Sequence, residues 1–270
     1  MNRNLIVDVG MHKGEDTEFY LRKGFNVVAI EANKELCDFV ASKLKKYISD
    51  GKLTIINAAI VKVAGQTNFY INNVVTEWGT TQKAWTERND KMGTTSRKVT
   101  VKGITFEEVI RSFGMPYFLK IDIEGDDHLC LYALKLFSDK PSYISIESVK
   151  TSWKELLEEF NLLKSLGYDR YKVVNQYKVP KQKCKNPPAE GKFVDHKFQF
   201  GSSGAFAEEA PGCWLNKTFA LIKYIKVFLI YKLVGNDGLF PNVHRRYPRK
   251  SKIKKFLHPQ WYDTHAKKSE

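Results

Sequence analysis

Short β-rich runs alternate with helical stretches along the first 175 residues of this 270-residue chain, and this alternation constrains the fold more than any other sequence feature. Strands are expected at residues 5–9, 26–31 and 53–58, with helices at 15–23 and 34–47 between them. Strands that are separated by helices pair in parallel, because the crossover returns the chain to the same edge of the sheet. The sequence therefore predicts an α/β fold, namely a Rossmann-like, doubly wound and mostly parallel sheet.

The pattern continues less regularly after residue 59. Residues 60–63 and 67–71 predict an antiparallel hairpin, and the polar stretch 72–96 predicts a long loop that serves as a lid or contacts the substrate. Further strands are expected at 99–101, 117–123, 142–147 and 170–174, with helices at 105–112 and 152–166.

A soft boundary is expected near residue 176. Residues 1–175 would form the cofactor-binding domain, and 176–270 a C-terminal extension with a loop-rich segment, an apolar helix at 219–234 and a basic tail. The chain carries a net charge of +14, and its last 55 residues hold 13 Lys and Arg against three acids. Such a tail favours a polyanionic partner: nucleic acid, an anionic membrane or an acidic glycan.

The apolar run 219–234 has 16 residues and three lysines, which is short of the roughly 20 apolar residues that span a bilayer. Seven Lys and Arg and no acid follow between 244 and 255, so the stretch 219–255 is a candidate for binding an anionic membrane surface. Packing of this helix on the protein body is the alternative. Without a leader pattern, and with four cysteines that lack metal spacing, the expected location is cytoplasmic, with peripheral binding at the inner membrane face possible.

The turn Asp8-Val9-Gly10-Met11-His12-Lys13-Gly14 lies between the first strand and the first helix, which begins near Asp16 and Thr17. Glycines at such a turn allow the backbone to approach a ligand closely. Glu31 follows Gly10 by 21 residues, at the end of the second strand, where a carboxylate can accept hydrogen bonds from a ribose. Together these residues predict a cofactor that contains a nucleoside.

The spacing of the glycines distinguishes between two such cofactors. A nicotinamide dinucleotide favours Gly-x-Gly-x-x-Gly, which cradles its pyrophosphate, whereas this turn has Gly-x-x-x-Gly. S-adenosylmethionine has no phosphate, and Asp8 can meet its amino group. The sequence therefore favours S-adenosylmethionine.

A second group of polar residues follows the expected fourth strand, in Leu119-Lys120-Ile121-Asp122-Ile123-Glu124-Gly125. Period-two alternation places Lys120, Asp122 and Glu124 on one face, where three charges require a solvated cleft. Asn57 and Ala58 end the third strand and can hold the adenine edge.

These residues resemble the FkbM-type class I methyltransferases. The resemblance covers roughly residues 5 to 150 and rests on the glycine turn, Glu31-Ala32-Asn33, Asn57-Ala58-Ala59-Ile60 and, most specifically, the fourth-strand motif. It implies the class I methyltransferase fold and O-methylation of a hydroxyl on a saccharide, glycan precursor or natural product. The candidate cofactor-binding residues are Asp8, Gly10, His12, Gly14, Asp16, Thr17, Glu31, Ala32, Asn33, Asn57, Ala58 and Asp122.

Two features qualify the resemblance. Asp126-Asp127-His128 follows Gly125, where the family usually has small or acidic residues, and Trp261-Tyr262-Asp263-Thr264-His265-Ala266 is similar to the tail of glycan-associated members. O-methylation needs a base near the transferred methyl group. The candidate catalytic residues are Asp122, Glu147 and His128, with His196 as a further histidine.

The carboxylates can alternatively gather Mg²⁺, although the sequence predicts no particular metal site. Two other functions stay open. One is methylation of RNA, which the basic tail favours and the lack of a recognised RNA-binding module opposes; the other is a non-catalytic protein that binds a membrane or glycan through its tail.

Overall fold

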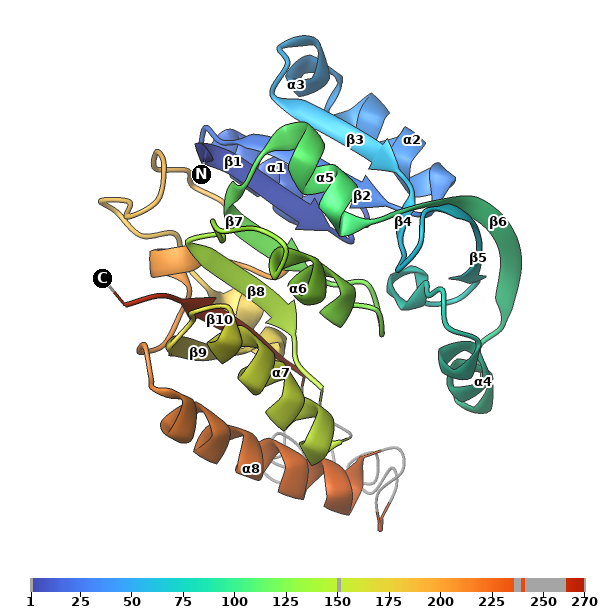
Figure 1. The fold of residues 1–270 in the computed structure, drawn as a ribbon, viewed down its shortest axis with the longest axis vertical. Coiled ribbons are helices and arrows are strands. Elements are labelled where there is room, and N and C mark those ends of the chain that lie inside the picture. Colours follow the sequence, from blue (N-terminus) through green and yellow to red (C-terminus); the bar gives the residue numbers. More distant parts are fainter. Residues whose placement is uncertain (1, 150–151, 236–238, 241–260, 270) are drawn as a thin grey trace.

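The computed structural model describes residues 2–149, 152–235, 239–240 and 261–269. Within them, seven strands form one sheet in the order β3-β2-β1-β7-β8-β10-β9 (Figure 1). The strands are β1 (Asn2–Val9), β2 (Asn26–Glu31), β3 (Leu53–Asn57), β7 (Pro116–Ile121), β8 (Tyr143–Glu147), β9 (Arg170–Asn175) and β10 (Tyr262–Lys267). All are parallel except β10, which is antiparallel to both of its neighbours. The predicted α/β class with a mostly parallel sheet is confirmed.

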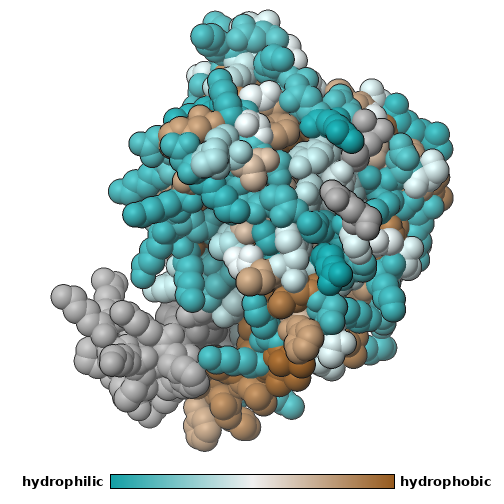
Figure 2. Space-filling view, turned by 90° about the vertical axis from the view of Figure 1, so that its left-hand side faces the viewer, coloured by the Kyte–Doolittle hydropathy of each residue, from teal (hydrophilic) through white to brown (hydrophobic). Residues whose placement is uncertain are grey.

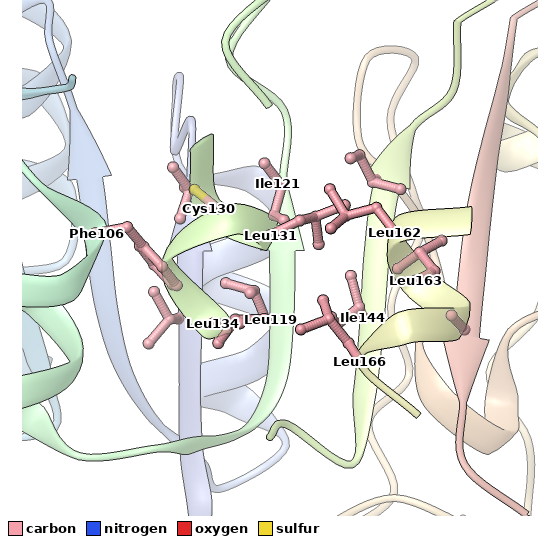
Figure 3. Packing of buried hydrophobic residues seen from close by; sticks show 14 of the residues in the cluster. Phe106, Leu119, Ile121, Cys130, Leu131, Leu134, Ile144, Leu162, Leu163 and Leu166 are labelled. Carbon is pink, nitrogen blue, oxygen red and sulfur yellow. The ribbon is translucent and has the colours of Figure 1, made fainter. Parts of the chain in front are cut away.

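Both faces of this sheet are covered, as a doubly wound fold requires. Leu5, Val7 and Val9 of β1 point into one core, and Ile6 points into the other, because successive strand residues face opposite sides. The first core is closed by α5 (Phe106–Phe113), α6 (His128–Leu134), α7 (Trp153–Ser165) and α8 (Lys217–Val234). Figure 3 shows leucines of α6 and α7 packing against Leu119, Ile121 and Ile144 of β7 and β8.

The second core combines α1 (Glu15–Arg22) and α2 (Lys34–Lys43) with residues that come much later in the chain. Val179, Val194, Phe198 and Phe206 pack on Phe19 and its neighbours in α1. A buried ion pair of 3.0 Å between Lys23 and Glu209 joins the same two regions. A segment with little regular structure, containing η2 (Gln176–Lys181) and η3 (Ala207–Glu209), therefore covers part of the sheet where a helix would otherwise pack.

The region between β3 and α5 differs from the prediction. The expected hairpin is wrong: β4 (Ala59–Ile60) pairs parallel to β6 (Ser96–Ile104), and β5 (Gly65–Asn72) pairs antiparallel to β6 over its full length. The stretch 72–96 is a structured connection that includes η1 (Thr76–Trp78) and α4 (Lys83–Lys91). The sequence signal for β6 was weak because its exposed face is rich in lysine, arginine and threonine. The helix predicted at 34–47 is also divided at Leu44, where α2 gives way to α3 (Lys45–Ser49).

The residues after 175 are part of the same sheet. Residues 262–267 form β10, which lies between β8 and β9, and α8 packs Ala220, Tyr224 and Val227 into the first core. The expected division into a cofactor-binding domain (1–175) and a C-terminal extension (176–270) stays a prediction, because contacts between the two parts do not show where a domain ends. The basic run 244–255 lies outside the described residues. No helix in the described part of the chain combines the length and the apolarity that crossing a bilayer requires.

Candidate active site

A cavity of about 710 Å³ lies at the carboxyl ends of the central strands. This edge is where open α/β sheets bind their ligands. The residues predicted for the site that line the cavity are Gly10, His12, Asp16, Glu31, Ala32, Asn33, Ala58, Asp122 and Glu147. Lys120 and Glu124 of the fourth-strand motif also line it.

The glycine turn lies directly against the end of β7. Gly10 has φ +88°, and a Cβ atom at this position would lie 1.8 Å from the backbone oxygen of Asp122. Its backbone N–H donates to the carbonyl of Ile30 over 3.0 Å. Gly14, with φ +72°, begins α1 and packs on Val40. The turn is therefore closed between β2 and β7 so tightly that Gly10 tolerates no side chain.

Glu31 is held in place by two backbone donors from the neighbouring loops. The N–H groups of His12 and Asn33 donate to its two carboxylate oxygens at 3.0 Å and 2.8 Å. Burial raises the pKa of Glu31 despite these hydrogen bonds. Each oxygen retains a lone pair on the cavity side, so the carboxylate is oriented to accept hydrogen bonds from a ligand diol.

Lys120 is a buried cation at the base of the cavity. Its ammonium group lies 3.2 Å from Asp8 and 3.7 Å from both Asp16 and Asp122, and it donates to the carbonyl of Gly10. Burial acts to lower the pKa of Lys120, but the three carboxylates outweigh it and raise the pKa. The charged lysine thus joins the ends of β1, β7 and α1.

Three carboxylates, Asp122, Glu147 and Asp263, gather where β7 and β8 end and β10 begins, and we call them the carboxylate cluster. Asp263 lies directly opposite Glu147 in the β8–β10 register, and Asp122 follows the strand next to β8. Burial, together with the nearby charges of Asp122 and Glu147, raises the pKa of Asp263 well above its ordinary value. Burial also raises the pKa of Asp122, an effect that Lys120 opposes and Glu147 reinforces.

Aromatic side chains also line the cavity. These residues, which we call the aromatic wall, come from η1, α4, the 200–203 loop, α8 and the position before β10: Trp78, Trp85, Phe200, Tyr231 and Trp261. Phe200 and Trp261 meet edge to face with ring centroids 5.3 Å apart. The 72–96 connection is tied to the fourth-strand loop, since Thr80 donates to the carbonyl of Glu124 and Gln82 to that of Gly125. The predicted lid or substrate-contacting segment therefore does border the cavity.

Five of the predicted site residues lie outside the cavity lining. The carboxylate of Asp8 is buried between Thr17 and Lys120, so it faces the lysine rather than a ligand. The amide of Asn57 donates to the carbonyls of Glu31 and Ala32, and Gly14 and Thr17 support the turn from behind.

His128 begins α6 and lies 3.9 Å from the buried carboxylate of Glu159, which raises the pKa of His128. His196 stacks on Phe19, on the other face of the sheet. The histidines proposed as bases thus have structural contacts.

The charge of the cavity can be compared with that of the expected cofactor. Among the described residues, nine acids line the cavity against two permanent cations, Arg88 and Lys120. S-adenosylmethionine carries a sulfonium and an ammonium group, which such a surface attracts. Its ribose fits the oriented Glu31, and its adenine fits the apolar part of the lining, which includes Ala58, Ile60, Phe69 and Ile71. The residues present therefore fit this cofactor.

A metal site is not evident in the same region. In the part of the chain that the structure describes, no three His, Cys, Asp or Glu side chains are grouped so that they can hold a metal ion.

Comparison with known proteins gives a family match. The model described as the methyltransferase FkbM domain matches residues 8–170. No relative was found among curated proteins. Solved structures with a similar fold include the precorrin-6y C5,15-methyltransferase of Geobacter metallireducens GS-15, with 12% identity, a TM-score of 0.41 and coverage of 100% of this chain and 82% of that one.

A second is a SAM-dependent methyltransferase of Archaeoglobus fulgidus, with 12% identity, a TM-score of 0.39 and coverage of 99% and 87%. These structural similarities are too weak to bear on function. The family match spans more than half of the chain and contains the glycine turn, Glu31, the fourth-strand motif and Glu147. The chain belongs to the FkbM family of methyltransferases, enzymes whose methyl donor is S-adenosylmethionine.

Proposed function

We propose that this methyltransferase transfers the methyl group to a hydroxyl of a saccharide or glycan precursor. The observation that carries the proposal is that the carboxylate cluster and the aromatic wall line one cavity. Carboxylates accept hydrogen bonds from several hydroxyls at once, and aromatic rings stack on the C–H faces of sugar rings. This pairing of surfaces suits a polyhydroxylated ring better than a flat apolar acceptor.

The cofactor would lie along the glycine turn, with Glu31 on the ribose hydroxyls and Asp16 near the ammonium group. When bound, S-adenosylmethionine supplies an activated methyl group, whose S–C bond breaks as the O–C bond to the acceptor forms. The chain's residues hold the acceptor hydroxyl in line and remove its proton.

Asp263 and Glu147 are the groups best placed to take that proton. They lie opposite each other on adjacent strands, and two carboxylates that share a site raise the pKa of at least one of them. A raised pKa makes a carboxylate a stronger base near neutral pH. Asp122 is less suited, because Lys120 lies 3.7 Å from it and stabilises its charge. The hydroxyl proton would thus pass to the Asp263–Glu147 pair.

The test is an acceptor screen with methyl-labelled S-adenosylmethionine. The panel contains neutral sugars, uronic acids, nucleotide sugars, a catechol and a short RNA, and mass spectrometry locates the transferred methyl group. We expect label on a sugar hydroxyl, and its loss in Asp263→Asn. Label on RNA or the catechol alone would overturn the proposed acceptor class. If S-adenosylhomocysteine binds but no sugar is methylated, the saccharide assignment fails.

RNA is the less suitable acceptor on electrostatic grounds. The nine acids that line the described cavity would repel a phosphate backbone, although the tail of the chain is basic.

A further inference from the structure

The outer face of α8 is an exposed apolar stripe. Phe219, Ile222, Ile225, Leu229 and Leu233 follow one another at three- and four-residue steps, and each is between 43% and 59% exposed. The opposite face packs Ala220, Tyr224, Val227 and Val234 into the protein. Leu239 and Phe240 are also exposed and fold back on the helix end, where their N–H groups donate to the carbonyls of Lys232 and Leu233.

Apolar side chains also gather at the surface near this helix. Figure 2 shows hydrophobic side chains gathered at the lower end of the molecule, where α8 lies in Figure 1. Scattered apolar residues are normal on a protein surface, whereas a contiguous patch indicates an interaction.

The charges that α8 itself carries are all of one sign. Lys223 and Lys232 lie at the two edges of the stripe at helical spacing, and Lys226 lies within it. The helix contains four lysines and no acid. Long lysine side chains beside an apolar stripe can extend to the headgroup level while the stripe enters the acyl region.

The same charges argue against two other occupants. In a symmetric dimer through α8, the lysines of one copy would face those of the other with no acid on the helix to offset them. A bilayer-spanning role is opposed by the helix itself, because its inner face packs on the protein.

We propose that α8 docks this protein on an anionic lipid bilayer, with the apolar stripe in the interface and the lysines on the headgroups. The sequence after α8 adds seven Lys and Arg between 244 and 255, which increases the positive charge available to the same surface. Tyr231, between Leu229 and Leu233 in sequence, lines the active-site cavity from the inner side of the same helix. Docking would therefore hold one wall of the cavity close to the membrane surface.

The experiment is vesicle co-sedimentation of the full chain, using phosphatidylcholine vesicles with and without phosphatidylglycerol. We expect binding to the anionic vesicles that falls as salt is added. The double variant Ile222→Ser, Leu229→Ser should lower the partition coefficient by about tenfold or more, since each buried apolar side chain contributes to insertion. Exchanging Lys223, Lys226 and Lys232 for Gln should lower it by roughly fivefold per lysine.

Matched controls separate the stripe from general surface effects. Val63→Ser with Leu136→Ser removes two exposed apolar residues on other elements, and Lys45, Lys46 and Lys62 exchanged for Gln remove three exposed lysines elsewhere. Both controls should bind like the parent chain, and circular dichroism should show equal folding for all variants. Absence of binding to anionic vesicles, or equal losses in stripe and control variants, would overturn the proposal. A dimer in light scattering that Leu229→Ser dissociates would assign the stripe to a second copy instead.

Discussion

The two ends of the cavity are built in different ways. The turn end, with Gly10, His12, Glu31, Asn33 and Ala58, comes from the segments that follow β1, β2 and β3, and its Glu31 carboxylate is held by backbone N–H donors. The acceptor end combines the carboxylate cluster and the aromatic wall, which come from segments spread between residues 78 and 263. Its carboxylates act on one another, since burial together with the charges of Asp122 and Glu147 raises the pKa of Asp263. The turn end supplies the groups that hold the cofactor, while the acceptor end supplies separate residues that can choose the acceptor.

The largest effect is expected at the acceptor end, from Asp263→Asn. Loss of a general base lowers kcat by about a hundredfold to ten-thousandfold, and binding of S-adenosylhomocysteine should stay nearly unchanged because the turn end is intact. Single-turnover kinetics and calorimetry measure the two quantities separately. An unchanged kcat would remove Asp263 from the reaction.

The pH profile sharpens this assignment. A base must be deprotonated, so kcat should rise with pH through the raised pKa of Asp263. Glu147→Gln removes a like charge that raises this pKa, and the acid limb of the remaining activity should then move to lower pH.

Gly10→Ala tests the turn end. The added Cβ would clash with the backbone of Asp122, which should weaken binding of S-adenosylhomocysteine by roughly a hundredfold, or about 3 kcal/mol. Gly24→Ala is the matched control, since Gly24 also has a positive φ of +100° but open space around its Cβ position. Equal losses in both variants would show that backbone strain, not the closed turn, is responsible.

A smaller effect is expected from Glu31→Ala. Removing an oriented acceptor from the ribose should cost about tenfold or more in affinity for S-adenosylhomocysteine. Calorimetry with NADH as a second ligand completes the test. The protein should not bind NADH, because its glycine turn lacks a cradle for the pyrophosphate. Retained affinity in the variant would place the ribose elsewhere.

A modest effect of pH on cofactor affinity is expected from Asp16, which lies between the turn end and the acceptor end of the cavity. Burial raises the pKa of Asp16 to about 6, against the lowering effect of Lys120. Its carboxylate is therefore mostly ionised at pH 7 and mostly protonated at pH 5, so affinity for the cationic cofactor should fall by up to about tenfold over this interval. The fall should be absent in Asp16→Asn, and a fall of the same size in that variant would assign it to another group.

The smallest effect on activity is expected at His128, which lies outside the cavity lining. His128→Ala should leave kcat within about twofold, while the loss of the partner of Glu159 lowers Tm by a few degrees. Thermal melting and steady-state assays check both parts. A large drop in kcat without a change in Tm would return His128 to the list of bases.

The same comparison explains what could be predicted from the sequence. Gly10, Glu31 and Asp122 could be predicted because local sequence patterns indicate them. These patterns are a strand, the glycine turn that follows it, and an acid at the end of a later strand. Lys120 stood in the recognised motif, but its role depends on Asp8 and Asp16, which come from other elements. Asp263 was noted only as part of a tail motif, since nothing local indicates that residues 262–267 enter the sheet between β8 and β9.

The aromatic wall was missed for a related reason. Trp78 and Trp85 lie in a stretch without apolar periodicity, and Phe200 in a loop whose glycines and serines predict only a turn. Their contribution arises from tertiary contacts alone. Two sequence features could have indicated this part of the cavity: the tail motif, and Ser202 and Ser203 between two glycines. Ser203 does line the cavity, and its N–H donates to Asp16.

The position of β10 has a consequence for how the molecule is synthesised. β10 lies between β8 and β9 in the folded sheet, but it is synthesised about ninety residues after β9. Until then both strands present an unpaired edge, which is the kind of surface that favours aggregation. The residue that completes the carboxylate cluster, Asp263, is carried by that same strand. The nascent chain therefore acquires its full set of acids only when the sheet closes, so that a prematurely truncated product would be both poorly protected and without a complete site.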